Sequence, residues 1–347
     1  MRRRLYAIAA AVAVHLVAAP TIAFSQPGSD PTTVPGFLCL GDDVPVTTSD
    51  AVRATIAALP DATEVTFTET YRDFERPGRV VHADGQVMMI QWTSGSPNRG
   101  ELVERFFYDD DTLVCGETRF TEPPALQERG ADQPGIIRAW ITPGEAFRAE
   151  RNGEPLGDGG FAYADEMEGS GYDSYDRFAS AVAGSEAESR YMPLACKDMI
   201  ETYEANMGGA FACGAMAGYE VHLIEEDLRQ ALRLVRDGEA TTMWIPAPGF
   251  TRFGPMLEWR GAPDEGGNFD PEALIVRVFV DQGDGTEEQR LAIGRLWGAR
   301  PCFDAWVDVA GNPDHNEDAR LLADSPPLYL IACDPPDLAD DAPQKVD

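Results

Sequence analysis

The sequence predicts an α+β fold: an N-terminal helix with an antiparallel β-meander domain, followed by a disulfide-stapled domain of mixed α/β sheet and helices. Two patterns lead to this prediction. Apolar residues alternate at period two between turn signals in the first half of the chain, and helix-type and strand-type patterns alternate after residue 190. With 347 residues, 44% of them hydrophobic, the chain is long enough to bury one large core or two ordinary ones, and we favour two. We therefore expect domains at 37–155 and 191–334.

The N-terminus has the three-part layout of a secretory signal peptide. Arg2–Arg4 precede the apolar run Leu5–Ala19, and Ala23 and Ser25 suit a cut before Gln26. The apolar run is shorter than the ~20 residues that a membrane anchor, the alternative, would need. We expect residues 1–25 to be removed, 26–36 to be a linker, and the mature chain to be soluble in the periplasm or outside the cell.

Export changes how the cysteines are interpreted. An even number of cysteines in an oxidising compartment indicates disulfides, and no C-x-x-C pair suggests thioredoxin-type catalysis or structural zinc. Six cysteines can pair in fifteen ways. We favour the sequential pairs because one pair falls in each third of the chain: Cys39–Cys115, Cys196–Cys213 and Cys302–Cys333.

The charge limits the partners. The chain has 28 basic and 59 acidic residues, a formal net charge of −31, and signal removal makes it three units more negative. Such a field repels nucleic acid and anionic membrane surfaces, so a neutral or cationic ligand or protein partner is expected. Adaptation to salt and a compositional bias of the genome both remain explanations for the acidity.

The first domain should open with a capped helix and continue in hairpins. Val52–Leu59 has helical spacing, and Val65–Tyr71 alternates with polar residues as a strand with one wet face does. Turn residues at Asp84–Gly85, Asp109–Asp111 and Pro143–Gly144 then separate strand-like runs.

Residues 156–190 are rich in Gly, Asp, Ser and Glu, which predicts a linker or loop with a short helix near Tyr175–Ala183. The alternative is a recognition loop that uses carboxylates and the rings of Tyr163, Tyr172 and Tyr175 on a cationic ligand.

The second domain should alternate helices and strands. Leu274–Val280 is apolar on both faces, which is typical of a central strand, and Thr286 is placed to cap a following helix. The expected helices are Cys196–Asn206, Glu225–Arg236 and Thr286–Trp297. The other expected strands are Thr241–Ile245, Phe303–Val309 and Leu328–Ala332. An acidic tail at 335–347 should be disordered.

Oxygen ligands are densest between Asp304 and Asp318, where calcium is the one cofactor that the sequence suggests. The alternate spacing resembles the start of a calcium loop, although Ala319 replaces the glycine that an EF-hand requires, and a solvated turn is the alternative. The expected ligands are Asp308, Asn312, Asp314, Asn316 and Asp318.

Two pairings that involve His222 have spacings that would suit chemistry. His222 and Glu226 would share a helical face suited to zinc, and Cys213 with His222 would suit nucleophilic catalysis. A helix-start histidine and a disulfide explain the same residues more simply.

No common hydrolase, nucleotide-binding or metalloprotease motif is present. We therefore expect a non-catalytic binding or scaffolding protein. The alternatives are a carboxylate-based hydrolase, which a surplus of acids could conceal, and an inhibitor or docking protein that uses its acidic surface.

The disulfide prediction can be tested by mass spectrometry. Denatured, unreduced protein from its native compartment should take up no alkylating label, and reduction should expose all six cysteines. Six labelled cysteines before reduction would contradict the prediction.

Overall fold

The computed structural model describes residues 62–326 except 72–73, 97–99, 110, 122–135, 142–147, 153, 156–163, 203–207, 248, 265 and 297–299. All of these residues belong to one compact unit that spans 37–347. The helix expected at Val52–Leu59, the strand Leu328–Ala332, the signal peptide and the acidic tail lie outside the described residues. Within the described part there is no helix that could span a membrane.

Strands make up most of the described structure. The first group is β1 (Thr63–Tyr71), β2 (Phe74–Ala83), β3 (Gln86–Ser96), β4 (Gly100–Asp109), β5 (Thr112–Thr121), β6 (Ile136–Ile141), β7 (Arg148–Arg151) and β8 (Glu154–Pro155). The second group is β9 (Glu188–Pro193), β10 (Asp198–Thr202), β11 (Gly208–Met216), β12 (Tyr219–Glu226), β13 (Arg229–Arg236) and β14 (Glu239–Trp244). The last is β15 (Thr251–Pro263), β16 (Phe269–Asp281), β17 (Glu287–Arg295) and β18 (Cys302–Asp308). The described helices are α2 (Ala164–Val182) and α3 (His315–Asp324).

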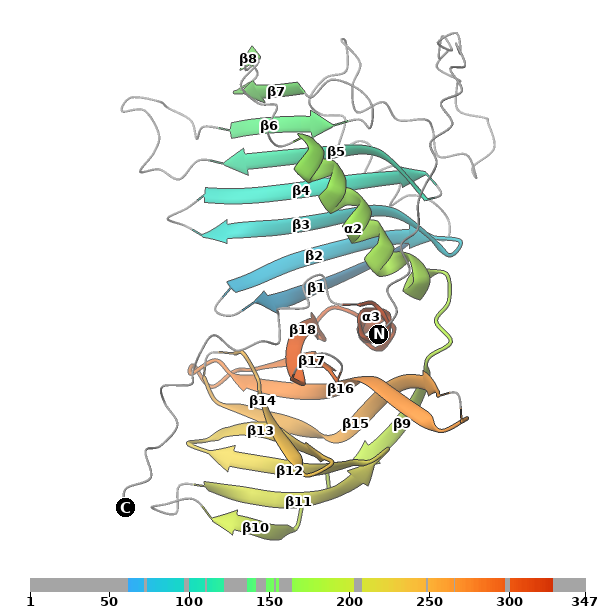
Figure 1. Ribbon diagram of the computed structural model, residues 1–347. Coiled ribbons are helices and arrows are strands. Elements are labelled where there is room, and N and C mark those ends of the chain that lie inside the picture. Colours follow the sequence, from blue (N-terminus) through green and yellow to red (C-terminus); the bar gives the residue numbers. More distant parts are fainter. Residues whose placement is uncertain are drawn as a thin grey trace, which may run out of the picture. The chain divides into compact units, whose positions relative to one another are not determined.

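The strands join into one large, almost wholly antiparallel sheet (Figure 1). From β8 the hydrogen-bonded order runs back through β2 to β1, which pairs with β18, and continues through β17 and β16 to β15. The far edge of β15 pairs with β9 and, at Thr251, with β13, which continues the sheet through β12 and β11 to β10. The predicted α+β class is therefore wrong, although the meander of its first half is present. The division into domains stays a prediction.

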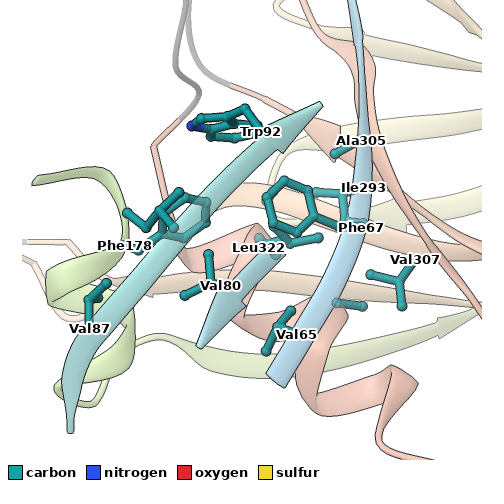
Figure 2. Packing of buried hydrophobic residues seen from close by; sticks show 14 of the residues in the cluster. Val65, Phe67, Val80, Val87, Trp92, Phe178, Ile293, Ala305, Val307 and Leu322 are labelled. Atoms are coloured by element: carbon teal, nitrogen blue, oxygen red, sulfur yellow. The ribbon is translucent and has the colours of Figure 1, made fainter. Parts of the chain in front are cut away.

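Helix α2 covers one face of the first strands and lies across β3 to β5 (Figure 1). Its Phe178 packs against Phe67 and Trp92, with ring centroids 5.7 and 6.2 Å away, and Figure 2 shows the three side chains converging. The indole nitrogen of Trp92 donates to Ser174 Oγ of the same helix, so this buried polar group is satisfied. The residues expected as a linker thus contain a core helix, longer than the short one predicted.

The alternative of a recognition loop gains no support from this helix, and Tyr163 lies outside the described residues. Tyr172 and Tyr175 are partly buried against this first core cluster, and the Tyr175 ring lies 5.0 Å from that of Tyr108. Their rings serve packing rather than presentation to a ligand.

A second core cluster lies on the other face of the C-terminal strands. Leu232 and Met243, from β13 and β14, are buried with Val276, Ala292 and Phe303, from β16 to β18. Strands β14 and β18 are in contact although they are not neighbours in the hydrogen-bonded order. The C-terminal strands therefore bury both faces, as expected for Leu274–Val280, which lies within β16.

Burial on both faces explains why the helix expected at Thr286–Trp297 is strand β17. Leu291 and Ile293 face the first core cluster, whereas Ala292 and Leu296 face the second. Consecutive apolar residues that fit a helical stripe also fit a strand with two buried faces. Thr286 caps no helix, because its hydroxyl and amide donate to Asp284 in the hairpin turn.

The helices expected at Cys196–Asn206 and Glu225–Arg236 are also wrong. The first contains strand β10. The second is broken at Asp227–Leu228, whose φ angles of +46° and +62° form a tight turn between β12 and β13. The Cys196–Cys213 disulfide links the segment before β10 to β11, in agreement with one predicted pair.

Helix α3 was not predicted, and a buried arginine of β17 holds its C-terminal end. Arg295 of β17 is 1% exposed; its Nε contacts both Asp304 oxygens at 3.1 and 3.0 Å, and its other nitrogens donate to the carbonyls of Leu322 and Ala323. Both carbonyls belong to the last turn of the helix, where the Leu322 carbonyl also accepts from the Ser325 amide, and the helix carries no basic residue in this turn. A strand residue thus caps the helix.

We expect Phe178→Ala to destabilise the protein by about 3–5 kcal/mol, because it leaves a cavity between α2 and the sheet. Asp176→Ala, on the exposed side of the same helix, is the matched control and should change stability little. Urea unfolding measures both. A small loss of stability in Phe178→Ala would mean that the packing of α2 on the sheet contributes little to the stability of the core.

Candidate functional site

The candidate site is a groove of about 340 Å³ on the face of β1 to β3 that α2 does not cover. Side chains alternate between the two faces of a strand. Because Phe67 and Trp92 point toward α2 (Figure 2), the neighbouring threonines and Gln91 point into the groove. The lining residues are Thr66, Phe67, Thr68, Pro77, Gly78, Arg79, Gln91, Thr93 and Asp308.

Strand register brings the polar side chains together. Thr66 lies opposite Arg79, and Arg79 lies opposite Gln91, so these three residues form a row across β1, β2 and β3. Thr68 lies opposite Trp306 of the antiparallel strand β18, which places Asp308 beside Thr66 in the groove. Residues more than 200 positions apart thus contribute to one surface.

Each charged group of the groove has a partner of opposite charge. Arg79 Nη1 lies 3.2 Å from Glu64 Oε1, and Asp308 Oδ1 lies 3.4 Å from Arg290 Nε. Partial burial raises the pKa of Asp308 from its ordinary value, and Arg290 opposes that shift. The groove is therefore close to electrically neutral even though the chain as a whole is strongly acidic.

The Gln91 amide has a defined orientation. Its Oε1 accepts a hydrogen bond of 2.8 Å from Arg105 Nε, and Arg105 Nη1 lies 3.4 Å from the buried carboxylate of Glu117. These two contacts fix the orientation of the Gln91 amide and leave its Nε2 as a donor for a bound molecule. Together with three threonine hydroxyls, the groove offers both donors and acceptors.

The groove does not supply a catalytic carboxylate pair. Asp308 is the single carboxylate among its lining residues. General acid and base catalysis of glycoside hydrolysis requires two such groups on either side of the scissile bond. The hydrolase alternative therefore gains no support from this groove.

The five expected calcium ligands are spread over the end of β18, the following turn and the first turn of α3. Asn312 Nδ2 donates to Asp318 Oδ2 at 2.8 Å, Asp308 is paired with Arg290, and Asn316 is exposed. Among the described residues, no three His, Cys, Asp or Glu side chains form a group that could hold a metal ion. Calcium at this turn stays a hypothesis.

Asp318 is nevertheless an unusual carboxylate. It is 2% exposed, and burial raises its pKa to about 6, with a smaller contribution from the charges of Asp314 and Glu317. Its neighbour His315 donates from Nδ1 to the carbonyl of Asn312, and its Nε2 lies 3.3 Å from Arg277 Nη2. Asn312, His315 and Asp318 thus form a polar network within a turn whose other residues are mostly exposed.

The histidine pairings do not form. His222 lies in strand β12, so Glu226 is about 13 Å further along the strand instead of one helical turn away. Cys213 is bonded to Cys196 and supplies no thiolate. Cys302 is also disulfide-bonded; its expected partner Cys333, Cys39 and the Cys115 side chain lie outside the described residues.

No family model, no curated protein and no solved structure matches the chain.

Of the groove residues, sequence reasoning singled out Asp308 alone, as a calcium ligand. The signal that could have found them was the wet face of Val65–Tyr71, where Thr66 and Thr68 alternate with apolar residues. Alternation identifies a polar face, but the row it forms with Arg79 and Gln91 depends on strand register.

Asp318 should make stability depend on pH. The pKa of Asp318 in the folded protein, about 6, lies above the ordinary value of 3.8. At a pH between these two values, the folded protein therefore keeps a proton on Asp318 that the unfolded chain has released. The free energy of unfolding should fall as the pH rises from about 4 to 6 and remain lower above that. Asp318→Asn should remove this slope and, after allowance for solvent screening, stabilise the protein at pH 7 by on the order of 1 kcal/mol.

Urea unfolding at a series of pH values measures the effect, with the exposed Asp270→Asn as the control. An unchanged slope in Asp318→Asn would assign the pH dependence to other groups.

Proposed function

We propose that this is an exported, non-catalytic binding protein whose groove on β1 to β3 takes a small, neutral, hydroxyl-rich molecule such as a saccharide. The observation that carries the proposal is the lining: three threonine hydroxyls, a fixed amide and two charges that are already paired. A charged ligand would have to displace Glu64 or Arg290 from their partners. A neutral molecule with many hydroxyls can satisfy the groove without breaking either pair.

The size of the groove agrees with such a ligand. A volume of about 340 Å³ is at the lower end of the range for small-molecule sites and too small for a folded partner. Because the surrounding strands are held by hydrogen bonds on both edges, the groove is largely formed before the ligand arrives.

Export is supported by the Cys196–Cys213 disulfide, which is compatible with a periplasmic or secreted protein. The signal peptide at 1–25 remains a proposal that rests on its sequence pattern. An oxidising compartment would also expose the groove to soluble saccharides rather than to cytosolic nucleotides.

Calorimetric titration with maltose, cellobiose and N,N′-diacetylchitobiose tests the proposal. At least one should bind, and Gln91→Ala should weaken it about tenfold because the amide donates directly to the ligand. Gln282→Ala, in the exposed loop between β16 and β17, is the matched control and should bind as the original protein does. Binding that is insensitive to Gln91→Ala would place the ligand elsewhere, and no binding of any of the three would contradict the saccharide class.

A further inference from the structure

One hairpin turn differs from its three counterparts. Among the described residues, four two-residue hairpin turns have both central residues at positive φ: Asp84–Gly85, Ala217–Gly218, Asp237–Gly238 and Asp227–Leu228. The first three have glycine at the second position, with φ between +76° and +84°. The fourth has Leu228, at φ +62°. Glycine adopts this region freely, whereas a side chain with a Cβ does not.

The fold does not compensate for this strain. Leu228 is 73% exposed, the largest exposed fraction among the big apolar side chains of the described residues. It gains little from burial, and the turn would form more easily with glycine. Strain without a folding benefit indicates that the side chain serves something outside the molecule.

Two more exposed apolar side chains lie near Leu228. Arg229 pairs in parallel with Thr251, which brings the Asp227–Leu228 turn close to the start of β15, where Phe250 directly precedes Thr251. Trp244 is opposite Ala231 on the same edge of β13. Trp244 and Phe250 are 44% and 46% exposed. We call Leu228, Trp244 and Phe250 the apolar tip.

The charges beside the apolar tip limit what can cover it. Glu225, Glu226 and Asp227 directly precede Leu228, and Arg229 is the one cation next to it in sequence. Together with the net charge of −31, these acids repel anionic surfaces and attract cations. A complementary partner would combine apolar side chains with a rim of Lys or Arg.

We propose that the apolar tip docks a basic protein segment that carries apolar anchors, at a site separate from the groove. Leu228, Trp244 and Phe250 supply the central desolvated contact, in which exposed aromatic side chains contribute most per residue, and the three acids orient the partner's cations. Leu228 directly precedes β13, Trp244 ends β14 and Phe250 directly precedes β15, and none of these residues lines the groove.

The probe is a fluorescein-labelled amphipathic peptide of Lys and Leu, whose binding is followed by fluorescence anisotropy. Leu228→Gly should weaken the binding about tenfold. The same substitution should raise the melting temperature by about 2–4 °C, because glycine relieves the strained turn. A Leu228→Gly variant that is more stable and binds the peptide more weakly would indicate that Leu228 serves docking and not folding.

Ala217→Gly is the matched control, since it changes the backbone freedom of a neighbouring hairpin without touching the apolar tip; its binding should be unchanged. Phe250→Ser is a second variant that should also weaken binding about tenfold. Equal binding by Leu228→Gly and the original protein would show that net charge alone attracts the peptide and would overturn the proposal. Leu228-dependent binding to phosphatidylcholine vesicles, without binding to the peptide, would replace the protein segment with a lipid surface.

Discussion

The pairing of β1 with β18 is the contact on which the rest of the structure depends. It joins the meander of the first half of the chain to the strands of the second, with Thr68 opposite Trp306 and Glu69 opposite Ala305. Side chains from both halves fill the core that runs beneath this junction, among them Phe67, Phe178 and Ile293 (Figure 2). Without this pairing, each half would leave an unpaired strand edge and an open apolar face.

Buried ion pairs flank the junction. Arg177 of α2 is paired with Glu69 of β1, and Arg295 of β17 with Asp304 of β18. A buried ion pair makes a small net contribution to folding stability, but removal of one partner leaves an uncompensated buried charge. They therefore specify how both helices sit on the sheet more than they add to its stability. Arg295 also satisfies the end of α3, so strand and helix depend on each other.

The same junction creates the candidate site. The side chains on one face of β1 and β18 close the core, and those on the other face contribute Thr66, Thr68 and Asp308 to the groove. The groove is nearly neutral on a strongly acidic protein, and the apolar tip is hydrophobic beside three acids. The groove and the apolar tip therefore differ from the average acidic surface of the protein, and we place binding at these two sites. A solvated acidic surface by itself gives little specificity for one ligand.

Local periodicity determined part of this fold. The strands at 63–71 and 274–280 and the Asp84–Gly85 hairpin follow from alternation and turn chemistry that neighbouring residues already contain. The Cys196–Cys213 bond likewise agrees with the cysteine count and spacing. The threonines of the groove could be recognised as polar strand positions, but not as parts of a site.

Tertiary structure decided the rest. Glu225–Arg236 and Thr286–Trp297 have apolar residues at spacings that suit a helix, and they form strands because layers on both sides bury successive residues of β17 and because Asp227–Leu228 turns the chain back. Whether a strand has one buried face or two depends on segments distant in sequence, and so does the register that assembles the groove. By itself the sequence determined the alternation, the turns and the charge; only packing between distant strands decided which faces are buried, because burial is a property of the neighbours and not of the segment.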